Sequence, residues 1–329
     1  MSNLNLNPNI FNSDVEKVPT RDGMGHGLVE AAKMDERIVG LCADLTESTR
    51  MHWFAEEFPE RFFQVGITEQ HMASMGSGMA AMGKIPFIAG YATFSPGRNW
   101  EQIRTTICYN DQPVKIIGSH AGVSTGPDGG THQALEDIAI MRVLPNVVVI
   151  SPCDHIEAKK ATLALAKTSE PTYIRLGRSN TPVITTEETP FKIGEAQTFF
   201  ESKGDTIDVG IVATGPLVFE ALKAAKELDE EGVKVRVINL STIKPLDEKA
   251  ILNIAEDSGA IVTVEEHQIA GGMGSAVSEF LSKNKPTLME FVGVNDQYGQ
   301  SGDPEELVLH YKMDCESIKK AVARVLSKK

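Results

Sequence analysis

Cysteine, positive charge and long apolar runs are all scarce in this sequence. Its 329 residues include four cysteines, which lie far apart without Cys-x-x-Cys spacing, so we expect buried free thiols in a reducing cytosol. No run of eighteen apolar residues occurs and no apolar segment follows Met1, which favours a soluble cytoplasmic protein without a membrane partner. The net charge of −13 argues against a nucleic-acid partner but does not exclude a phosphorylated metabolite.

Two alternations of apolar and amphipathic segments follow a polar, Asn-rich start. Apolar segments of four to seven residues, separated by helices, predict parallel sheets covered on both faces. The polar residues 181–205 lie between the two alternations. We therefore predict an α/β protein of two domains, each a mainly parallel sheet covered by helices. The predicted units are a polar segment at 1–19, a first domain at 20–190 and a second domain at 191–329.

Hydrophobic periodicity places the individual elements. In the first domain we expect strands at 38–43, 62–65, 86–92, 114–119, 147–151 and 172–176, and helices at 22–34, 52–58, 69–82, 99–110, 131–143 and 155–167. In the second we expect strands at 209–213, 233–240, 260–265 and 288–292, and helices at 217–231, 247–258, 273–283 and 316–327.

The rest of the chain is organised around residues 62–72, Phe-Phe-Gln-Val-Gly-Ile-Thr-Glu-Gln-His-Met. Gly66 ends the predicted strand, and Glu69 opens a helix whose small residues permit close packing. Glu69 thus stands at a strand-to-helix junction, the usual place for ligands in open α/β sheets. The local sequence alone favours a simpler interpretation, in which Thr68 caps the helix and Glu69 complements its dipole.

A second motif, Asp-Gly-Gly-Thr-His-Gln at 128–133, changes this interpretation. Together with Gly-Ile-Thr-Glu-Gln-His-Met at 66–72 and Leu-Pro-Asn-Val-Val-Val-Ile-Ser-Pro at 144–152, it resembles the transketolase family of thiamine diphosphate enzymes. The resemblance covers nearly the whole chain after Thr20. It matches the C-terminal half of the family, which contains the pyrimidine-binding domain and the transketolase C-terminal domain.

The resemblance implies a thiamine diphosphate site with Glu69 as its catalytic acid. Such an acid protonates the far ring nitrogen of the cofactor's aminopyrimidine through a strong hydrogen bond. Tyr91 and Phe94 match two cofactor-stacking positions, although aromatic residues usually pack in cores, and Gly97-Arg98 replaces a third aromatic of some members. Asp44 matches a residue that supports the cofactor region near the subunit interface, but turn formation explains an aspartate there equally well.

The resemblance also assigns substrate-binding roles. Asp128 and His132 fall on positions that contact sugar hydroxyls, and His132 would exchange protons with sugar oxygens. Helix capping by Asp128 or Thr131 is the simpler alternative and is compatible with this role. A phosphate pocket is expected from four residues at separate strand ends, because guanidinium groups bind phosphate bidentately. These residues are Arg21, Ser48, His120 and Arg178.

One part of a thiamine enzyme is missing from the chain. The family binds the diphosphate and Mg²⁺ with a Gly-Asp-Gly segment, and none occurs here. The chain also has about half the length of a one-piece transketolase. We therefore expect a split enzyme whose partner, the N-terminal transketolase subunit, supplies the diphosphate site and the Mg²⁺ ligands. The site would then form between chains, most simply in an α2β2 assembly.

The leading functional prediction is a transketolase subunit, active only with its partner, that transfers a two-carbon ketol unit between sugar phosphates, as in the pentose phosphate pathway. A 1-deoxyxylulose-5-phosphate synthase shares Glu-Gln-His and Tyr-x-x-Phe and stays open as an alternative. The β subunit of a 2-oxoacid dehydrogenase decarboxylase is a further one, but it normally carries His-Ser where this chain has Thr131-His132-Gln133. A non-catalytic assembly subunit is disfavoured by the presence of Glu69 with both aromatics.

Overall fold

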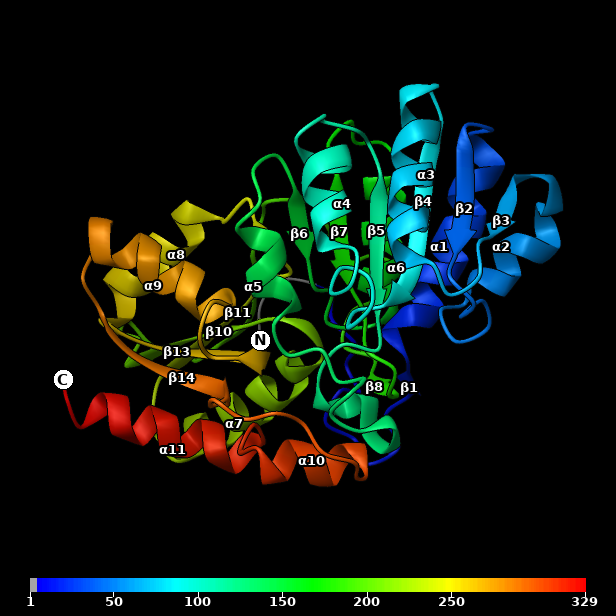
Figure 1. Cartoon of the computed structure of the whole chain (residues 1–329). Helices are drawn as coiled ribbons and strands as arrows, with labels where there is room; N and C mark the ends of the chain where they lie inside the picture. The colour runs from blue at the N-terminus through cyan, green and yellow to red at the C-terminus, as the bar shows by residue number, and fades with distance from the viewer. Residues whose placement is uncertain (1–4) are drawn as a thin grey trace.

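The computed structural model describes residues 5–329, which fold into two α/β units (Figure 1). Across the first sheet the strands are β12 (Thr242–Lys244), β6 (Val148–Ile150), β7 (Thr172–Arg175), β5 (Lys115–Ser119), β4 (Ile85–Tyr91), β2 (Ile38–Cys42) and β3 (Phe62–Gln64). Across the second they are β14 (Leu288–Val294), β13 (Ala260–Gln268), β10 (Val209–Ala213), β11 (Val235–Asn239) and β9 (Gln197–Glu201). Each sheet is parallel except for one antiparallel edge strand, β12 or β9, so the predicted fold class is confirmed.

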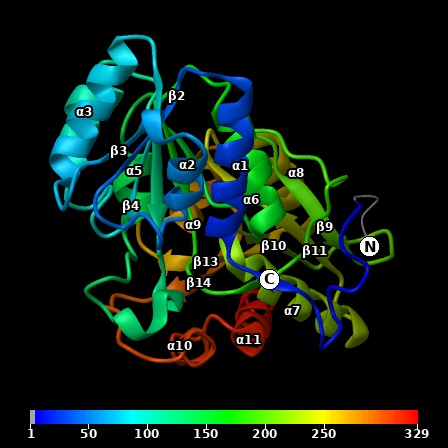
Figure 2. The same ribbon diagram turned by 90° about the vertical axis from the view of Figure 1, so that its right-hand side faces the viewer.

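Helices cover both faces of both sheets. On the first sheet, α1 (Thr20–Met34), α2 (Met51–Glu57) and α6 (His155–Leu165) cover one face, and α3 (Glu69–Ala81), α4 (Trp100–Gln102) and α5 (Asp137–Arg142) cover the other (Figure 2). On the second, α7 (Val218–Glu230) and α11 (Cys315–Leu326) lie opposite α8 (Glu248–Ser258) and α9 (Met273–Asn284). The short elements are η1 (Pro59–Arg61), the π-helix η2 (Ile103–Cys108), η3 (Val123–Asp128), η4 (Gly215–Leu217) and the ribbon of β1 (Lys17–Val18) with β8 (Thr181–Pro182).

Alternating strand residues feed two separate apolar clusters in the first unit. Leu41 and Ile88 pack with Met72 of α3, whereas Cys42 and Phe87 pack with Phe54 of α2. This division follows from the two-residue period of a strand, because successive side chains point to opposite faces. The sheet therefore holds α3 in a fixed position over one face, with the start of the helix close to the strand ends.

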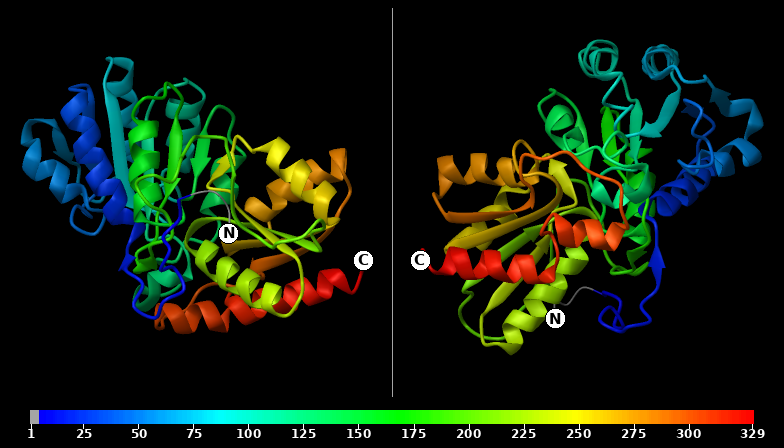
Figure 3. Two further views of the ribbon diagram at one scale, coloured as in Figure 1. Left: turned by 180° about the vertical axis from the view of Figure 1, so that it is seen from behind. Right: turned by 60° about the horizontal axis from the view of Figure 1, so that its bottom comes forward.

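The last part of the chain joins the two units. Helix α10 (Pro304–His310) contacts η3 of the first unit, while α11 covers the second sheet, so the two helices run beneath both units (Figure 3). Asp303 caps α10 by accepting the amide of Glu305 at 2.9 Å, and Pro304 occupies the first helical position, where it needs no hydrogen-bond donor. The segment before α10 is thereby brought against the 128–133 motif.

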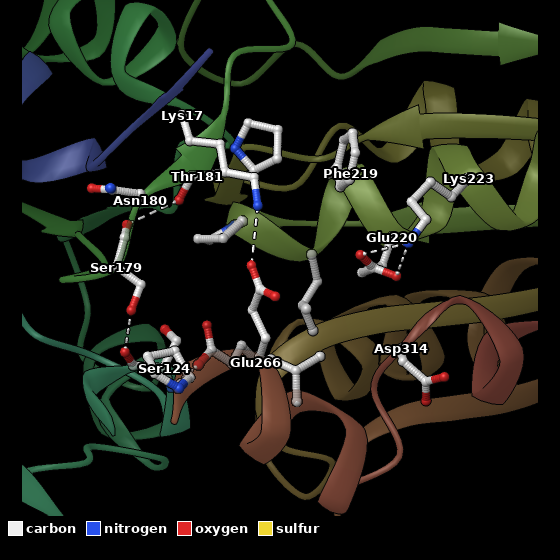
Figure 4. Close-up of a pocket in the computed structure, with 16 residues that line it drawn as sticks. Lys17, Ser124, Ser179, Asn180, Thr181, Phe219, Glu220, Lys223, Glu266 and Asp314 are labelled. Carbon is white, nitrogen blue, oxygen red and sulfur yellow. Dashed lines mark hydrogen bonds and ion pairs between the residues drawn. The ribbon is translucent and has the colours of Figure 1, made fainter. Parts of the chain in front are cut away.

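A cavity of about 360 Å³ lies in the same junction (Figure 4). Lys17 and Glu305 form an ion pair of 3.0 Å at its wall, and the buried Glu266 accepts the Ser124 amide at 2.6 Å. Phe219 of α7 adds an apolar surface. This cavity is lined by neither Glu69 nor Tyr91, so it is distinct from the candidate site described below.

Several predicted elements need correction. The predicted helix at 131–143 is wrong in its first half, since only Asp137–Arg142 is helical and residues 131–136 form turns. The predicted helix at 99–110 changes from α to π geometry at Ile103. The polar stretch at 181–205 contains strand β9, and β12 from the second half of the chain joins the first sheet. The domain limit at 190/191 stays a prediction.

Two further features bear on the predictions. All four cysteines are free and buried. None of the helices within residues 5–329 combines the length and the apolar character that a bilayer span requires. The predicted N-terminal segment 1–19 begins with four residues that lie outside the described part of the chain.

Candidate active site

Glu69 is the first residue of α3 and one of the most deeply buried acids of the first unit. Its side chain is 3% exposed, and its carboxylate lies 3.4 Å from an Arg98 guanidinium nitrogen. The Thr68 hydroxyl does not cap the helix but donates to the carbonyl of Val65 at 2.7 Å. The simpler interpretation, in which Thr68 caps α3 through its side chain, is therefore wrong. Glu69 is instead held at the strand-to-helix junction by the packing around α3.

Four rings lie together where β4 and β5 end. The rings of Tyr91 and Phe94 are parallel within 10°, with centroids 6.1 Å apart, and the other face of this group is formed by His120, which stacks on Tyr91 at 3.7 Å. His132 approaches Phe94 edge-on at 5.4 Å. We call Tyr91, Phe94, His120 and His132 the ring cluster. Parallel and edge-on contacts of this kind are the preferred arrangements of aromatic rings.

The residues predicted for a phosphate pocket are partly brought together. An Arg21 guanidinium nitrogen donates to the carbonyl of Ser48 at 2.8 Å and lies 3.2 Å from Nε2 of His120. Arg178 is close enough to lower the pKa of Arg21, although burial and Arg50 contribute more. The Nε of Arg21 is buried without a hydrogen-bond partner among the described residues. A buried donor without a partner is rare in proteins, and here it fits an anion that completes the pocket.

His120 is held in one protonation state. Burial is the largest cause that lowers its pKa to about 2, and Arg21 and Arg178 add repulsion. Because a guanidinium only donates, Nε2 of His120 accepts from Arg21 and the proton resides on Nδ1, which donates to the Ser119 hydroxyl at 2.9 Å. Its backbone φ of 56° is left-handed, an uncommon state for a non-glycine residue that is enriched at functional sites.

Asp44 and Asp128 lie outside the ring cluster as exposed carboxylates. Asp44 follows β2 with a left-handed φ of 59°, and its amide donates to the Gln64 side chain at 2.8 Å. Asp128 ends η3. Neither residue caps α5, whose N-terminal flanking residue, Glu136, makes no side-chain cap, so the capping alternative for the 128–133 motif is wrong.

The loop that carries His132 is fixed by residues that the sequence did not single out. The Gln133 side-chain amide donates to the carbonyls of Val123, Gly126 and Gln300, at 3.0, 3.2 and 3.0 Å. Gln133 belongs to the 128–133 motif, which was the only available signal for it. Its partner Gln300 comes from the segment before α10, so the second unit positions the loop of the first.

The donor set of the site suits one half of thiamine diphosphate. A buried carboxylate close to parallel aromatic rings fits a flat, nitrogen-containing ring that needs one strong hydrogen bond and stacking. No comparable fit exists for a metal-bound diphosphate. The one potential ligand group found among the described residues is Glu227, Cys315 and Glu316, and Lys319 already lies 2.9 Å from Glu227 there.

Comparison with known proteins places these features in a family. Residues 16–183 match the model of the transketolase pyrimidine-binding domain, and residues 201–318 match the transketolase C-terminal domain. A putative transketolase C-terminal section from Methanocaldococcus jannaschii is 41% identical, over 94% of this chain and 96% of its own length. One of the two subunits of an apulose-4-phosphate transketolase from Phocaeicola vulgatus is 37% identical, over 92% and 95%.

A solved structure agrees with the sequence comparisons. The structure described as a split gene transketolase, inactive beta4 tetramer, is 40% identical and superposes with a TM-score of 0.87 over 94% of this chain and 99% of that one. Domain models and relatives of similar length thus agree with the fold and with the position of the candidate site. The chain belongs to the transketolase family and is similar along nearly its whole length to the C-terminal subunits of split transketolases.

Proposed function

We propose that this chain is the pyrimidine-binding subunit of a split, thiamine diphosphate-dependent transketolase in the cytoplasm. It would transfer a two-carbon ketol unit between sugar phosphates, together with an N-terminal subunit that binds the diphosphate and Mg²⁺. The observation that carries this proposal is the buried Glu69 carboxylate, which the loop of residues 91–99 connects to the ring cluster. A buried acid beside stacked aromatics suits a pyrimidine ring better than any role in packing.

Each residue of the site has a role in this proposal. When bound, thiamine diphosphate supplies a nucleophilic thiazolium carbon. Glu69 acts as the catalytic acid that shares a proton with a ring nitrogen, while Tyr91 and Phe94 hold the ring by stacking. His132 is a second catalytic residue, which exchanges protons with a sugar oxygen from the edge of the ring cluster. Asp44 supports the cofactor region near the partner.

The substrate is oriented by groups at the same strand ends. Asp128 accepts hydrogen bonds from sugar hydroxyls. The neutral His120 is a hydrogen-bonding group rather than a cation, because Arg21 repels a second positive charge beside it. Arg21, Ser48 and Arg178 bind the phosphate, and the unpartnered Nε of Arg21 is the donor that awaits it.

The assembly is part of the same proposal. The sequence lacks Gly-Asp-Gly, and the described residues show no diphosphate site, which supports a partner chain in an α2β2 complex. The solved relative is described as inactive when it forms a tetramer of its β chain, and the Phocaeicola vulgatus relative is itself named as a subunit. We propose by analogy that this chain self-associates and is inactive without its partner.

The experiment uses the reconstituted complex of both subunits. Xylulose 5-phosphate with ribose 5-phosphate should give ketol transfer without release of carbon dioxide, and a panel of further ketose phosphates would identify the donor. Pyruvate with glyceraldehyde 3-phosphate should give no product. Release of carbon dioxide from pyruvate would instead support a 1-deoxyxylulose-5-phosphate synthase or a 2-oxoacid decarboxylase. Full activity of a Glu69→Ala complex that still assembles would support a non-catalytic subunit.

A further inference from the structure

Arg98 occupies the carboxylate on which the proposed function depends. Its guanidinium lies 3.4 Å from an oxygen of Glu69 and is the one ion-pair partner recorded for this acid within residues 5–329. The two members of the pair differ in exposure: the Glu69 side chain is 3% exposed and that of Arg98 is 55% exposed. The arginine therefore lies between the buried acid and the solvent.

The backbone fixes this placement. The side chain of Asn99, which is fully buried, donates to the Glu69 carbonyl at 3.1 Å and to the Ser95 hydroxyl at 3.2 Å. The Arg98 amide donates to the carbonyl of Phe94 at 2.9 Å. The loop is thus tied to the start of α3 and to the ring cluster, while the long side chain of Arg98 is the only part of the pair with room to move.

This pair conflicts with the role of Glu69 in binding a pyrimidine. A guanidinium beside a carboxylate takes one of its acceptor positions and favours its charged form, which opposes sharing of a proton with a ring nitrogen. A cofactor ring that reaches Glu69 must therefore displace the guanidinium. Because an ion pair with one exposed member contributes little stability, the displacement is easy and its effect on affinity is small.

We propose that Arg98 is a positioning residue that covers Glu69 in the free chain and competes with the cofactor's pyrimidine ring for its carboxylate. Arg98 thereby sets the affinity for the cofactor and keeps the buried acid paired until the site assembles. This inference rests on the proposed function, because it requires Glu69 to bind the ring. It assigns a function to the Gly97-Arg98 segment, where the sequence departs from the aromatic of some family members.

The test measures cofactor binding rather than activity. Thiamine diphosphate is titrated into the reconstituted complex with Mg²⁺, and quenching of tryptophan fluorescence is followed, since Trp100 lies two residues from Arg98. Arg98→Gln should bind the cofactor about two- to five-fold more tightly than wild type, the range expected for an exposed ion pair. Arg104→Gln, which alters an exposed arginine on η2, is the matched control and should leave the affinity unchanged.

A second variant separates this inference from the proposed function. In a Glu69→Gln background, Arg98→Gln should have no further effect on affinity, because the charged partner is absent. Unchanged or weaker binding by Arg98→Gln in the wild-type background would overturn the competition, even where Glu69→Gln abolishes activity. Retained activity of Glu69→Gln would overturn the proposed function instead. Thermal unfolding of each variant verifies that the chains are folded.

Discussion

At the residue scale, the site depends on two buried groups that are held in different ways. The Glu69 carboxylate is accessible only on the side where Arg98 lies, which is where a ligand can replace the guanidinium. His120 is enclosed among Tyr91, Ser119 and Arg21, so its ring cannot rotate or gain a proton without breaking these contacts. One group is therefore poised for exchange of partners, and the other is a rigid wall that carries a fixed hydrogen-bond pattern.

The role of Glu69 predicts the behaviour of a conservative variant. Glu69→Gln keeps the shape of the side chain but removes the acidic proton, and activity of the assembled complex should fall about 10²- to 10⁴-fold, as for other general acids. Steady-state ketol transfer measures the effect. Glu56→Gln, an exposed acid on α2, is the control and should retain wild-type activity. A loss of less than ten-fold in Glu69→Gln would contradict the assigned role.

The lowered pKa of His120 predicts how stability depends on pH. The folded ring has a pKa of about 2 and the unfolded one about 6.5, so only the unfolded state gains this proton as the pH falls below 6.5. The free energy of unfolding should therefore decrease below pH 6.5, by up to about 1.4 kcal/mol per pH unit from this residue. Urea unfolding of wild type and His120→Gln between pH 5 and 7 measures the difference. Equal slopes in the two proteins would contradict the neutral, buried state of the ring.

At the element scale, helix α6 joins the two units through its first turn. Glu157 accepts the Cys153 amide at 2.7 Å and the side-chain amide of Asn239, at the end of β11, at 2.8 Å. Asp154 caps the helix by accepting the Glu157 amide at 2.8 Å. Burial raises the pKa of Glu157 to about 7, and the nearby Asp154 contributes. This turn therefore holds a carboxyl group that is protonated in the folded chain below neutral pH.

Glu157 predicts a pH dependence of the opposite sign to that of His120. The folded state binds this proton up to about pH 7 and the unfolded state only up to about pH 4.5, so stability is lost as the pH rises through that window. Glu157→Gln should remove this loss, which amounts to about 3 kcal/mol between the two pH values. Denaturant unfolding at pH 4.5 and pH 7.5 measures the effect, and Glu256→Gln on the exposed side of α8 should behave like wild type. A Glu157 variant with an unchanged pH profile would be the contrary result.

Most elements could be predicted because their patterns are local. Helix α7 was placed within one residue at each end, since its apolar residues recur on one face. The failure at 131–136 has a tertiary cause, because Gln133 bonds to Gln300 and the backbone follows that contact rather than its helical propensity. Strand β9 was missed because its residues are half-exposed at a sheet edge, which leaves no clear alternation.

The candidate site could be predicted only as far as motifs reach. The motifs named Glu69, Tyr91 and His132, and their neighbours in the structure follow from strand ends that meet at one edge of a parallel sheet. The pair between Arg98 and Glu69 had no signal in the sequence, because the two residues belong to different elements. The positions of the predicted residues are now described, whereas their roles stay predictions.

At the scale of the whole molecule, one buried ion pair links the two sheets. Arg175 at the end of β7 donates to Asp137 of α5 at 2.9 Å and to the carbonyl of Glu266 in β13 at 2.7 Å. Both charged side chains are almost completely buried, at 4% and 1% exposure. The linkage joins the start of α5, which follows the His132 loop, to the second sheet. The second unit therefore serves the site by holding the loop and its helix in place.

This linkage predicts a large effect on stability. Arg175→Met keeps the length of the side chain but leaves the Asp137 carboxylate buried without its cation, so the free energy of unfolding should fall by about 3–5 kcal/mol. Urea unfolding measures the loss. Arg37→Met breaks an exposed pair with Asp35 and should cost at most about 1 kcal/mol. Similar small losses in both variants would show that the buried pair does not hold the units together.

The central claim is that this chain provides only the pyrimidine-binding half of a cofactor site. The most direct measurement is calorimetric titration of thiamine diphosphate with Mg²⁺ into this chain alone, into the N-terminal subunit alone and into an equimolar mixture of both. The account predicts saturable binding in the mixture, with one cofactor per pair of chains, and little binding by this chain alone. Tight binding by the isolated chain, or no binding by a mixture that has assembled, would contradict it.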